Sequence, residues 1–445
     1  MRSLPAALVL STAMIAAAGG AGSAAPPTGP VKSTPATGTP HLPTSNTTMQ
    51  IRQLKQCGST MYAVGSFSSI IKGSTTYSRH GAFSFQAVSP YTVTNWDPNV
   101  NGTVDTIAFN NGNCSNAYLG GKFTQIGSTA VKNIAEVSTS SGGVVGGFAS
   151  NAAGRVFTIA SVHGHLLVGG AFTGINGSTA APYFASLDPT TGKNDGYLAL
   201  NISGNYVFTD DSGHASESNA TKIYNQQVSP DGTRELVEGV FTTIGGQARR
   251  QVAMLDLGGG HATTDAWHAT EFDSNCATNQ PFYAQGAAWS PDGSAVYVGT
   301  NGYKPANGAG FSTGQPRAGL CDAMIAFPTT SGNVTHRWIN YTGCDSLYTA
   351  AADASTVYFG GHQRWASNSK GCDYAGPGAV VAPGMVGVSP STGGVTFNPT
   401  RDRGLGADDM LLTSAGLWIA SDNYQGSNRC GGVANLAGIC FLPYS

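Results

Sequence analysis

Charged side chains are scarce in this chain. Lys, Arg, Asp and Glu together make up 10 % of the 445 residues, whereas an average soluble domain contains about 25 %. The formal net charge is −2, and the Lys and Arg residues are scattered singly along the sequence. The chain therefore offers no basic stripe to a phosphate backbone and no polybasic patch to an anionic membrane. We expect no nucleic acid partner.

Long apolar runs and helical periodicity are also absent. No stretch after the amino terminus reaches about 18 apolar residues, so the sequence predicts no membrane span. No segment shows the apolar period of an amphipathic helix. Glycine, by contrast, accounts for 61 of 445 residues, roughly twice its usual share of about 7 %. With 40 % hydrophobic residues, this composition excludes disorder and indicates many turns around a large core.

The amino terminus has the features of an export signal. Arg2 provides a positive charge, residues 4–18 form a short apolar core, and small residues precede Ala25. Such a pattern is typical of a signal peptide that is removed on secretion. We therefore assign residues 1–24 as a signal peptide and expect the mature protein to be secreted, outside the cytoplasm.

A segment poor in large side chains follows the signal. Residues 25–45 are rich in Pro, Thr, Gly and Ser, a composition that favours an extended linker without a core of its own. We place this linker outside the fold, with the possible exception of its last residues, and assign residues 46–445 to one folded domain.

One short sequence motif, which we call the glycine phrase, recurs through that domain. It combines a β-rich run with a glycine pair and, in the stronger copies, with a Phe-Thr or Phe-Ser step. Equivalent positions of successive copies are separated by 49 residues (Lys122 to Ala171) up to 69 residues (Ala171 to Val240). The seven copies are Tyr62–Ile70, Tyr118–Ile126, Leu167–Ile175, Leu236–Ile244, Val296–Thr300, Val357–Gly361 and Leu417–Ser421.

The residues around each copy predict four strands. An alternating run and a turn such as Pro230–Gly232 precede the copy, which is the signature of a β-hairpin. A third run such as Val252–Asp256 and a shorter fourth run follow most copies. The fold class predicted is all-β, a seven-bladed β-propeller of four-stranded antiparallel blades. The last repeat has room for three strands, so residues His41 to Thr48 are candidates for its fourth.

The repeats of this sequence resemble a known family. The phrase around Phe241, followed by Arg249–Asp256, and the ending Leu187–Gly192 look like the delta-60 repeat of secreted bacterial β-propellers. The likeness spans about residues 49–445 and is strong in the second to fourth copies. The resemblance implies a propeller fold and secretion. It implies no catalytic residue, because that family is largely without an assigned activity.

Eight cysteines in an exported chain predict four disulfides. Cys57 and Cys114 fall at the first hairpin turn of adjacent repeats. Cys276 and Cys344 precede the first strands of two successive repeats, and Cys321 and Cys372 lie before the third strands, so pairing them within each repeat makes the two repeats equivalent. The last two cysteines remain for each other. A zinc site would need paired short spacings of Cys and His, which are absent, so we expect no metal and no cofactor. The predicted pairs are Cys57 with Cys114, Cys276 with Cys321, Cys344 with Cys372, and Cys430 with Cys440.

Function on such a fold is expected where loops converge around the central channel. The last three repeats insert long loops that combine aromatic, Arg, Asn and Asp side chains, a combination that suits a polar, ring-shaped ligand such as a sugar. The alternative is that these are solvated loops stiffened by disulfides. The candidate ligand-binding residues are Tyr303, Arg317, His362, Arg364, Trp365 and Tyr424.

Two classes of function stay open. The first is a monomeric, non-catalytic binding or scaffold protein that contacts a polysaccharide, the cell wall or a cell-surface protein at the channel mouth. The second is a carbohydrate-active hydrolase or lyase, because cleavage of a glycosidic bond requires two carboxyl groups at a set distance. The candidate carboxylates for the second class are Glu271, Asp273, Asp402, Asp408 and Asp409.

Overall fold

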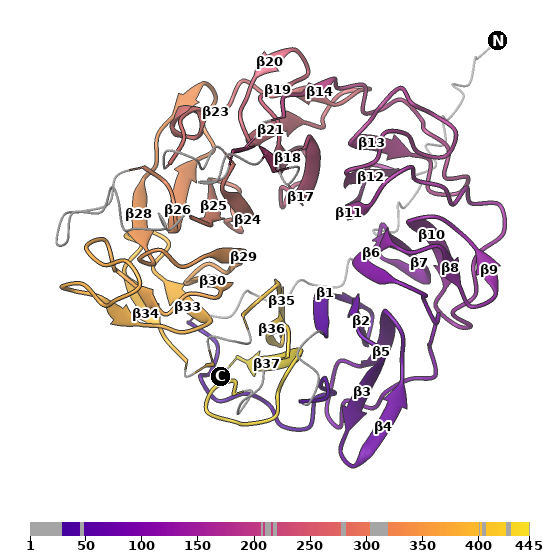
Figure 1. Cartoon of the computed structure of the whole chain (residues 1–445), viewed down its shortest axis with the longest axis horizontal. Coiled ribbons are helices and arrows are strands. Elements are labelled where there is room, and N and C mark those ends of the chain that lie inside the picture. The colour runs from indigo at the N-terminus through magenta and orange to yellow at the C-terminus, as the bar shows by residue number, and fades with distance from the viewer. Residues whose placement is uncertain are drawn as a thin grey trace, which may run out of the picture.

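The computed structural model describes residues 29–44, 49–205, 220–276, 282–302, 319–399, 401–402, 406–423 and 429–444, and the backbone of 208–209 and 215–216. This part of the chain is all-β, apart from the single 3-10 turn η2 (Thr270–Asp273). Antiparallel sheets stand side by side around a common centre, each with one strand nearest that centre (Figure 1). This is the arrangement of a β-propeller.

Each radial sheet is named here by its innermost strand. The radial sheets, written outward, are β1 (Gln50–Cys57), β2 (Thr60–Ser66) and β5 (Ala82–Gln86); β6 (Thr103–Asn110), β7 (Asn113–Lys122) and β10 (Ile134–Ser138); β11 (Val156–Val162), β12 (His165–Gly170) and β13 (Phe184–Leu187); β17 (Lys222–Val228), β18 (Arg234–Val240), β21 (Val252–Asp256) and β22 (Thr263–Thr264); β24 (Ala284–Trp289), β25 (Ala295–Thr300), β26 (Ala323–Pro328) and β28 (Trp338–Tyr341); β29 (Leu347–Ala352), β30 (Val357–Gly361), β33 (Met385–Val388) and β34 (Val395–Phe397); and β35 (Asp409–Thr413), β36 (Gly416–Ala420) and β37 (Ile439–Pro443).

Short ribbons decorate these sheets. They are β3 (Ser69–Lys72) with β4 (Thr75–Ser78); β8 (Gln125–Ile126) with β9 (Thr129–Ala130); β14 (Ile202–Ser203) with β19 (Thr243–Ile244) and β20 (Gln247–Ala248); β15 (Phe208–Thr209) with β16 (Ala215–Ser216); β23 (His268–Ala269) with β27 (Asn333–Val334); and β31 (Trp365–Ala366) with β32 (Val380–Val381).

The outermost strand is less regular than the sequence predicts. The β17, β24 and β29 sheets have four paired strands, whereas the other radial sheets have three. In the β1 sheet the fourth run makes a single bridge, Phe85 to Val93. The chain then turns aside to bury Trp96, whose ring packs 5.1 Å from that of Tyr62. Burial of the aromatic side chain thus replaces further strand pairing.

The glycine pair of the repeat has two separate structural causes. A Cβ on the first glycine would meet the next sheet: at Gly120 it would lie 2.5 Å from Val156, and at Gly169 it would lie 2.8 Å from Ile223. A Cβ on the second glycine would meet the paired inner strand, as at Gly121, 2.1 Å from the carbonyl oxygen of Thr103. The glycine pair is therefore needed because neighbouring sheets, and paired strands within one sheet, approach each other closely at these positions.

The phenylalanine column packs as the repeat predicts. Phe172 and Phe241 are fully buried, and Phe67 and Phe123 are at most 8 % exposed. Each belongs to a hydrophobic cluster that joins residues of more than one sheet. These side chains are therefore core and do not form a binding stripe.

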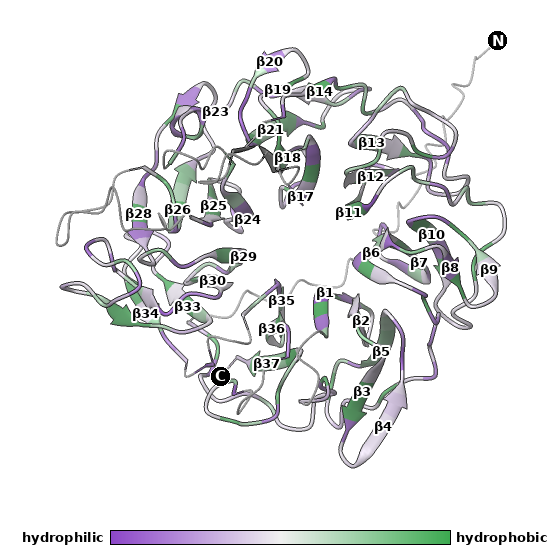
Figure 2. Cartoon of the chain, in the orientation of Figure 1, coloured by the Kyte–Doolittle hydropathy of each residue, from purple (hydrophilic) through white to green (hydrophobic). Residues whose placement is uncertain are grey.

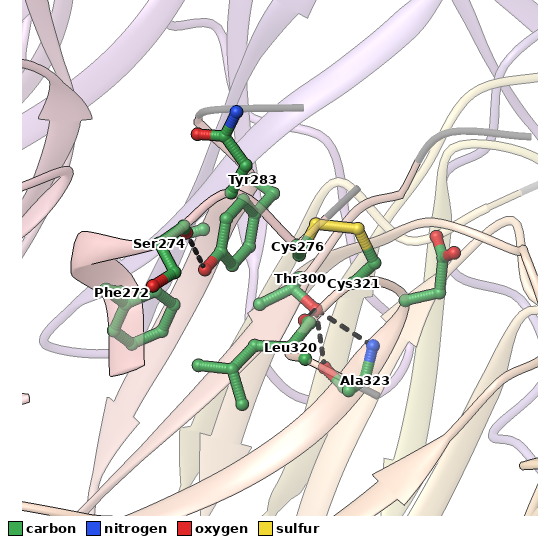
Figure 3. The surroundings of a disulfide bond; sticks show 12 residues. Phe272, Ser274, Cys276, Tyr283, Thr300, Leu320, Cys321 and Ala323 are labelled. Carbon is green, nitrogen blue, oxygen red and sulfur yellow. Dashed lines mark hydrogen bonds between the residues drawn. A yellow bond between two sulfur atoms is a disulfide. The ribbon is translucent and has the colours of Figure 1, made fainter. Parts of the chain in front are cut away.

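Four disulfides join the cysteines in the pairs that the repeat predicts. Cys57 and Cys114 link the first turns of two neighbouring sheets. Figure 3 shows the bond between Cys276 and Cys321 beside Thr300, whose hydroxyl accepts a hydrogen bond from Ala323 N at 2.8 Å. Four disulfides fit an extracellular environment.

The segment that precedes the first sheet is packed on the fold. Backbone hydrogen bonds run from Lys32 N to Pro443 O at 2.8 Å and from Ala36 N to Phe441 O at 2.9 Å, so the segment lies along the outer edge of β37. Leu42 is fully buried, and its N–H donates to Ala437 O. Residues 29–44 therefore differ from the linker outside the fold that their composition predicts.

The strand predicted to complete the last sheet also differs in position. The closing contacts along β37 come from residues 32–36, upstream of the predicted His41–Thr48, whereas His41 bridges to Ile71 in β3. Val31 and Leu42 are the buried apolar anchors of this segment. Their burial and the hydrogen bonds to the edge of β37 hold the segment on the fold.

Candidate functional site

A polar hollow of about 180 Å³ lies at the centre of the ring of sheets. Its lining includes residues from every innermost strand, β1, β6, β11, β17, β24, β29 and β35. These strands surround the middle of the molecule in Figure 1, and Figure 2 shows hydrophilic residues among the hydrophobic ones on β1 and β17. The hollow is therefore the central channel of the propeller.

In six of the radial sheets, a β-bulge places one side chain at this channel. The pairing of the innermost strand with its neighbour skips one residue near the start of the strand, such as Arg52 in β1 and Tyr348 in β29. A bulge redirects the side chain of the skipped residue. The seventh member, Asp408, directly precedes β35. We call this set the channel ring: Arg52, Asp105, Phe157, Tyr224, Gln285, Tyr348 and Asp408.

The ring stands at one end of the channel. The bulges lie where each innermost strand begins, which is also where the second strand of each sheet ends, as in the pairing of Ile51 with Gly65. The connections between sheets and the loops after the second strands therefore meet at this end, which we call the mouth face. The ring is the channel's rim on this face.

Ion pairs hold one side of the ring in place. Arg155 donates two hydrogen bonds to Asp105, each of 2.6 Å, and Arg52 lies 3.4 Å from the same carboxylate. Asp105 is buried, so paired cations are required to keep its charge stable. This side of the ring is accordingly preorganised and carries a net positive charge.

The side of the ring next to Arg52, in the neighbouring β35 sheet, is acidic. Burial, with the charge of Asp422 adding to it, raises the pKa of Asp408 to about 7. Burial also raises the pKa of Asp409 to about 6, although its carboxylate accepts a hydrogen bond from Leu54 N at 3.1 Å. Near neutral pH, Asp408 therefore exists as a mixture of the acid and the carboxylate and can both donate and accept a proton.

Several buried polar atoms have no hydrogen-bond partner among the described residues, and one of them belongs to Asp408 of the channel ring. Among the described residues, none donates to Asp408 Oδ2 or Asp422 Oδ1, and none bonds to the amide of Gln363, which is fully buried. Arg401, also buried, approaches Gly384, whose N–H donates to Gln363 O. Such atoms are normally satisfied by water or by a polar ligand.

Three of the six predicted ligand-binding residues are described. His362 reaches the ring: its side chain packs edge-on against Tyr348 at 5.4 Å, and its Nε2 lies 3.4 Å from Asp422 Oδ2. Arg364 binds Asp345, with Nε 2.9 Å from Oδ2, and stacks over Trp365 at 4.4 Å. Tyr303, Arg317 and Tyr424 lie outside the described residues.

The five predicted carboxylates divide into separate groups. Glu271 binds His336 at 2.8 Å, and Asp273 binds His268 at 3.0 Å; both follow β23 at the outer rim of the ring of sheets (Figure 1). Asp402 accepts a hydrogen bond from Arg429 N at 2.9 Å. Only Asp408 and Asp409 line the channel.

Most residues of the channel ring were not predicted from the sequence. The predicted set named Asp408 but not Arg52, Asp105, Phe157, Tyr224, Gln285 or Tyr348. A signal does exist: the second glycine of the repeat pairs with the residue immediately before the ring residue, as Gly121 pairs with Val104 and Gly170 with Val156. Finding it requires the strand register, because the first hairpin turn differs in length between copies.

The described residues contain no cluster of three or more His, Cys, Asp or Glu side chains arranged to hold a metal ion. No helix in the described part of the chain has the length and apolar character needed to cross a membrane.

Comparisons with known proteins support no assignment beyond the fold. No protein-family model matches the chain, and no curated protein matches it. Among solved structures, it is similar to U3-55K, with a TM-score of 0.49, 8 % identity and coverage of 92 % of this chain and 100 % of that one. It is also similar to the WD40 repeats of RRP9 (TM-score 0.46, 8 % identity, 92 % and 99 % covered) and to Sqt1 of Saccharomyces cerevisiae (0.44, 9 %, 88 % and 95 %). Similarities this weak say nothing about function.

Proposed function

We propose that this chain is a secreted, seven-bladed β-propeller of the delta-60 type. Seven copies of the glycine phrase, each in the second strand of a radial sheet, support the blade number. The signal-like residues 1–24 and the four disulfides support secretion. The segment 29–44 along β37 ties the amino-terminal end to the last blade and closes the ring.

We further propose that the protein binds a glycan at the channel mouth without transforming it. The observation that carries this proposal is the channel ring, in which Phe157, Tyr224 and Tyr348 stand among amide and charged side chains. Aromatic faces supply apolar area to a sugar ring, and amides, Arg and Asp fix its hydroxyl groups. The carboxyl group of Asp408 and the amide of Gln285 suit hydroxyl groups, which both donate and accept.

A binding measurement on two matched variants tests whether the channel is the binding site. Tyr348→Ala is expected to weaken binding of an oligosaccharide selected from a glycan array by about 1 to 2 kcal/mol, because a stacking face is lost. Isothermal titration calorimetry measures the change. Tyr77→Ala, in the outer ribbon β3–β4, provides a control away from the channel.

The loop residue Trp365 distinguishes the channel from the predicted loop site. If the ring binds the sugar, Trp365→Ala leaves the affinity unchanged while Tyr348→Ala lowers it. Loss of binding in Trp365→Ala alone would move the site to the β31–β32 ribbon and contradict the channel assignment.

A carbohydrate-active enzyme remains the second candidate, favoured by Asp408. Its pKa of about 7 suits proton transfer near neutral pH, and Asp422 provides a second carboxylate beside it. Glu271, Asp273 and Asp402 do not line the channel, and Asp409 accepts a hydrogen bond from Leu54 N, so Asp408 would act as the acid or base. Reducing-end release from a panel of polysaccharides, abolished in Asp408→Asn, would establish this function. Unchanged polymers after prolonged incubation would exclude it for that panel.

A further inference from the structure

A second hollow, of about 680 Å³, opens on the mouth face between the β6 and β11 sheets. Lys122 at the end of β7 and Lys132 before β10 form one wall, and Arg155 and Phe157 at the start of β11 form the other. We call it the basic groove. None of the described residues that line it is Asp or Glu.

The two lysines are available to a ligand. Both are exposed, and neither has an ion pair with a described residue. The whole chain has only 22 Lys and Arg residues, yet two exposed lysines without a described ion pair lie together in this groove. Arg155 is fixed by Asp105, so its charge is held in place.

The positive potential extends toward the channel. Arg52 in the channel ring and Arg155 in the groove belong to neighbouring parts of the mouth face. Arg52 shares Asp105 with Arg155, so two guanidinium groups face one carboxylate there. A ligand carrying negative charge would therefore be attracted to this side of the mouth.

The groove and the channel share one lining residue. Phe157 lines both hollows, and the Arg155 guanidinium lies 5.0 Å from the centre of its ring. A ligand long enough to pass over Phe157 would therefore contact both hollows. That geometry fits an extended polymer better than a single small molecule.

We propose that the basic groove binds the carboxylate groups of an acidic polysaccharide whose neighbouring sugar residues occupy the channel ring. This inference rests on the proposed glycan function and specifies its chemical class. Lys122 and Lys132 contact the carboxylates, and Phe157 provides the stacking face that joins groove and channel. The shared aromatic face favours a sugar chain over an acidic peptide.

The test compares polygalacturonate and alginate with the same polymers after reduction of their carboxylates to primary alcohols. Binding of the mature protein to each polymer is measured at low ionic strength and at about 0.5 M salt, where charges are screened over a few ångströms. The variant is Lys122→Gln/Lys132→Gln. The control, Lys193→Gln/Lys370→Gln, removes the same charge from exposed positions outside the groove.

The groove variant is expected to bind the acidic polymer about tenfold more weakly at low salt, equal to about 1.4 kcal/mol. The control variant and the reduced polymer should show no such difference, and high salt should remove it. If the reduced polymer binds as tightly as the acidic one, glycan binding stands and the acidic class is wrong. If neither polymer binds, the proposed function fails for these glycans as well. Preference for poly-glutamate over both polymers would instead indicate an acidic protein partner and overturn the proposal.

Discussion

Replacement of Glu235 by Met is expected to stabilise the protein, and to do so increasingly as the pH rises. Glu235 lies in β18, fully buried, and neither of its carboxyl oxygens has a hydrogen-bond partner among the described residues. It pairs across the sheet with Val228 and Leu255. Burial raises its pKa to about 8 from an ordinary value of 4.5. An unpartnered charge is unfavourable there, so the folded state keeps the proton.

The direction of the pH effect follows from this raised pKa. The stability contributed by the protonated Glu235 is fully present below pH about 4.5 and is lost as the pH rises to about 8. The loss is on the order of 4 kcal/mol. Met is similar in length and cannot titrate, so the Glu235→Met variant lacks this loss.

Urea unfolding of both proteins at pH 5, 6.5 and 8 provides the measurement. The difference in unfolding free energy between variant and wild type should be small at pH 5 and largest at pH 8. Glu238 has a pKa of about 8 as well, from the same cause, and its effect is common to both proteins. Parallel stability curves for the two proteins would show that Glu235 is solvated or paired in solution and would contradict the expectation.

Leu42→Ala is expected to reduce the unfolding free energy by about 2 to 5 kcal/mol. Leu42 belongs to the segment that precedes the first sheet, yet it is fully buried in a cluster with Ile51 and Ile439. A Cβ on Gly438 would lie 2.6 Å from Leu42 Cγ, which shows how tightly this side chain is packed. Truncation leaves a cavity between the segment, the β1 sheet and the last sheet.

Thr37→Ala, at an exposed position of the same segment, is the matched control. It should change the stability by less than about 0.5 kcal/mol. Thermal and chemical unfolding report both variants. Similar small effects for Leu42 and Thr37 would mean that the segment is only loosely attached and that the domain begins later in the sequence.

The glycine phrase made most of the fold predictable from the sequence. Gly120 and Gly121 occupy positions where a side chain would collide with Val156 and with the Thr103 carbonyl oxygen. Each such glycine pair in the sequence therefore indicates one sheet of the ring. The same repeat frame predicted the disulfides: Cys57 and Cys114 lie at the first turns of neighbouring repeats, and Cys276–Cys321 and Cys344–Cys372 join corresponding positions in two successive repeats.

The channel ring and the position of residues 29–44 were harder to predict from the sequence. The ring residues range from Arg to Phe, because positions that face the channel do not share a packing requirement. Their places in the sequence also depend on the lengths of the hairpins, which differ between repeats. Residues 25–45 look like a linker by composition, and nothing local reveals that Val31 and Leu42 find buried positions against the last sheet. Long-range contacts of this kind have no signature in the segment itself.

The most direct test of the channel assignment is a crystal structure of the mature protein soaked with the oligosaccharide that binds best on the array. The account predicts a sugar residue at the channel ring, in contact with Tyr348 and Phe157, with the chain continuing toward Lys122. A sugar bound only at the β31–β32 ribbon or on the face opposite the mouth, with the channel ring holding solvent alone, would contradict it.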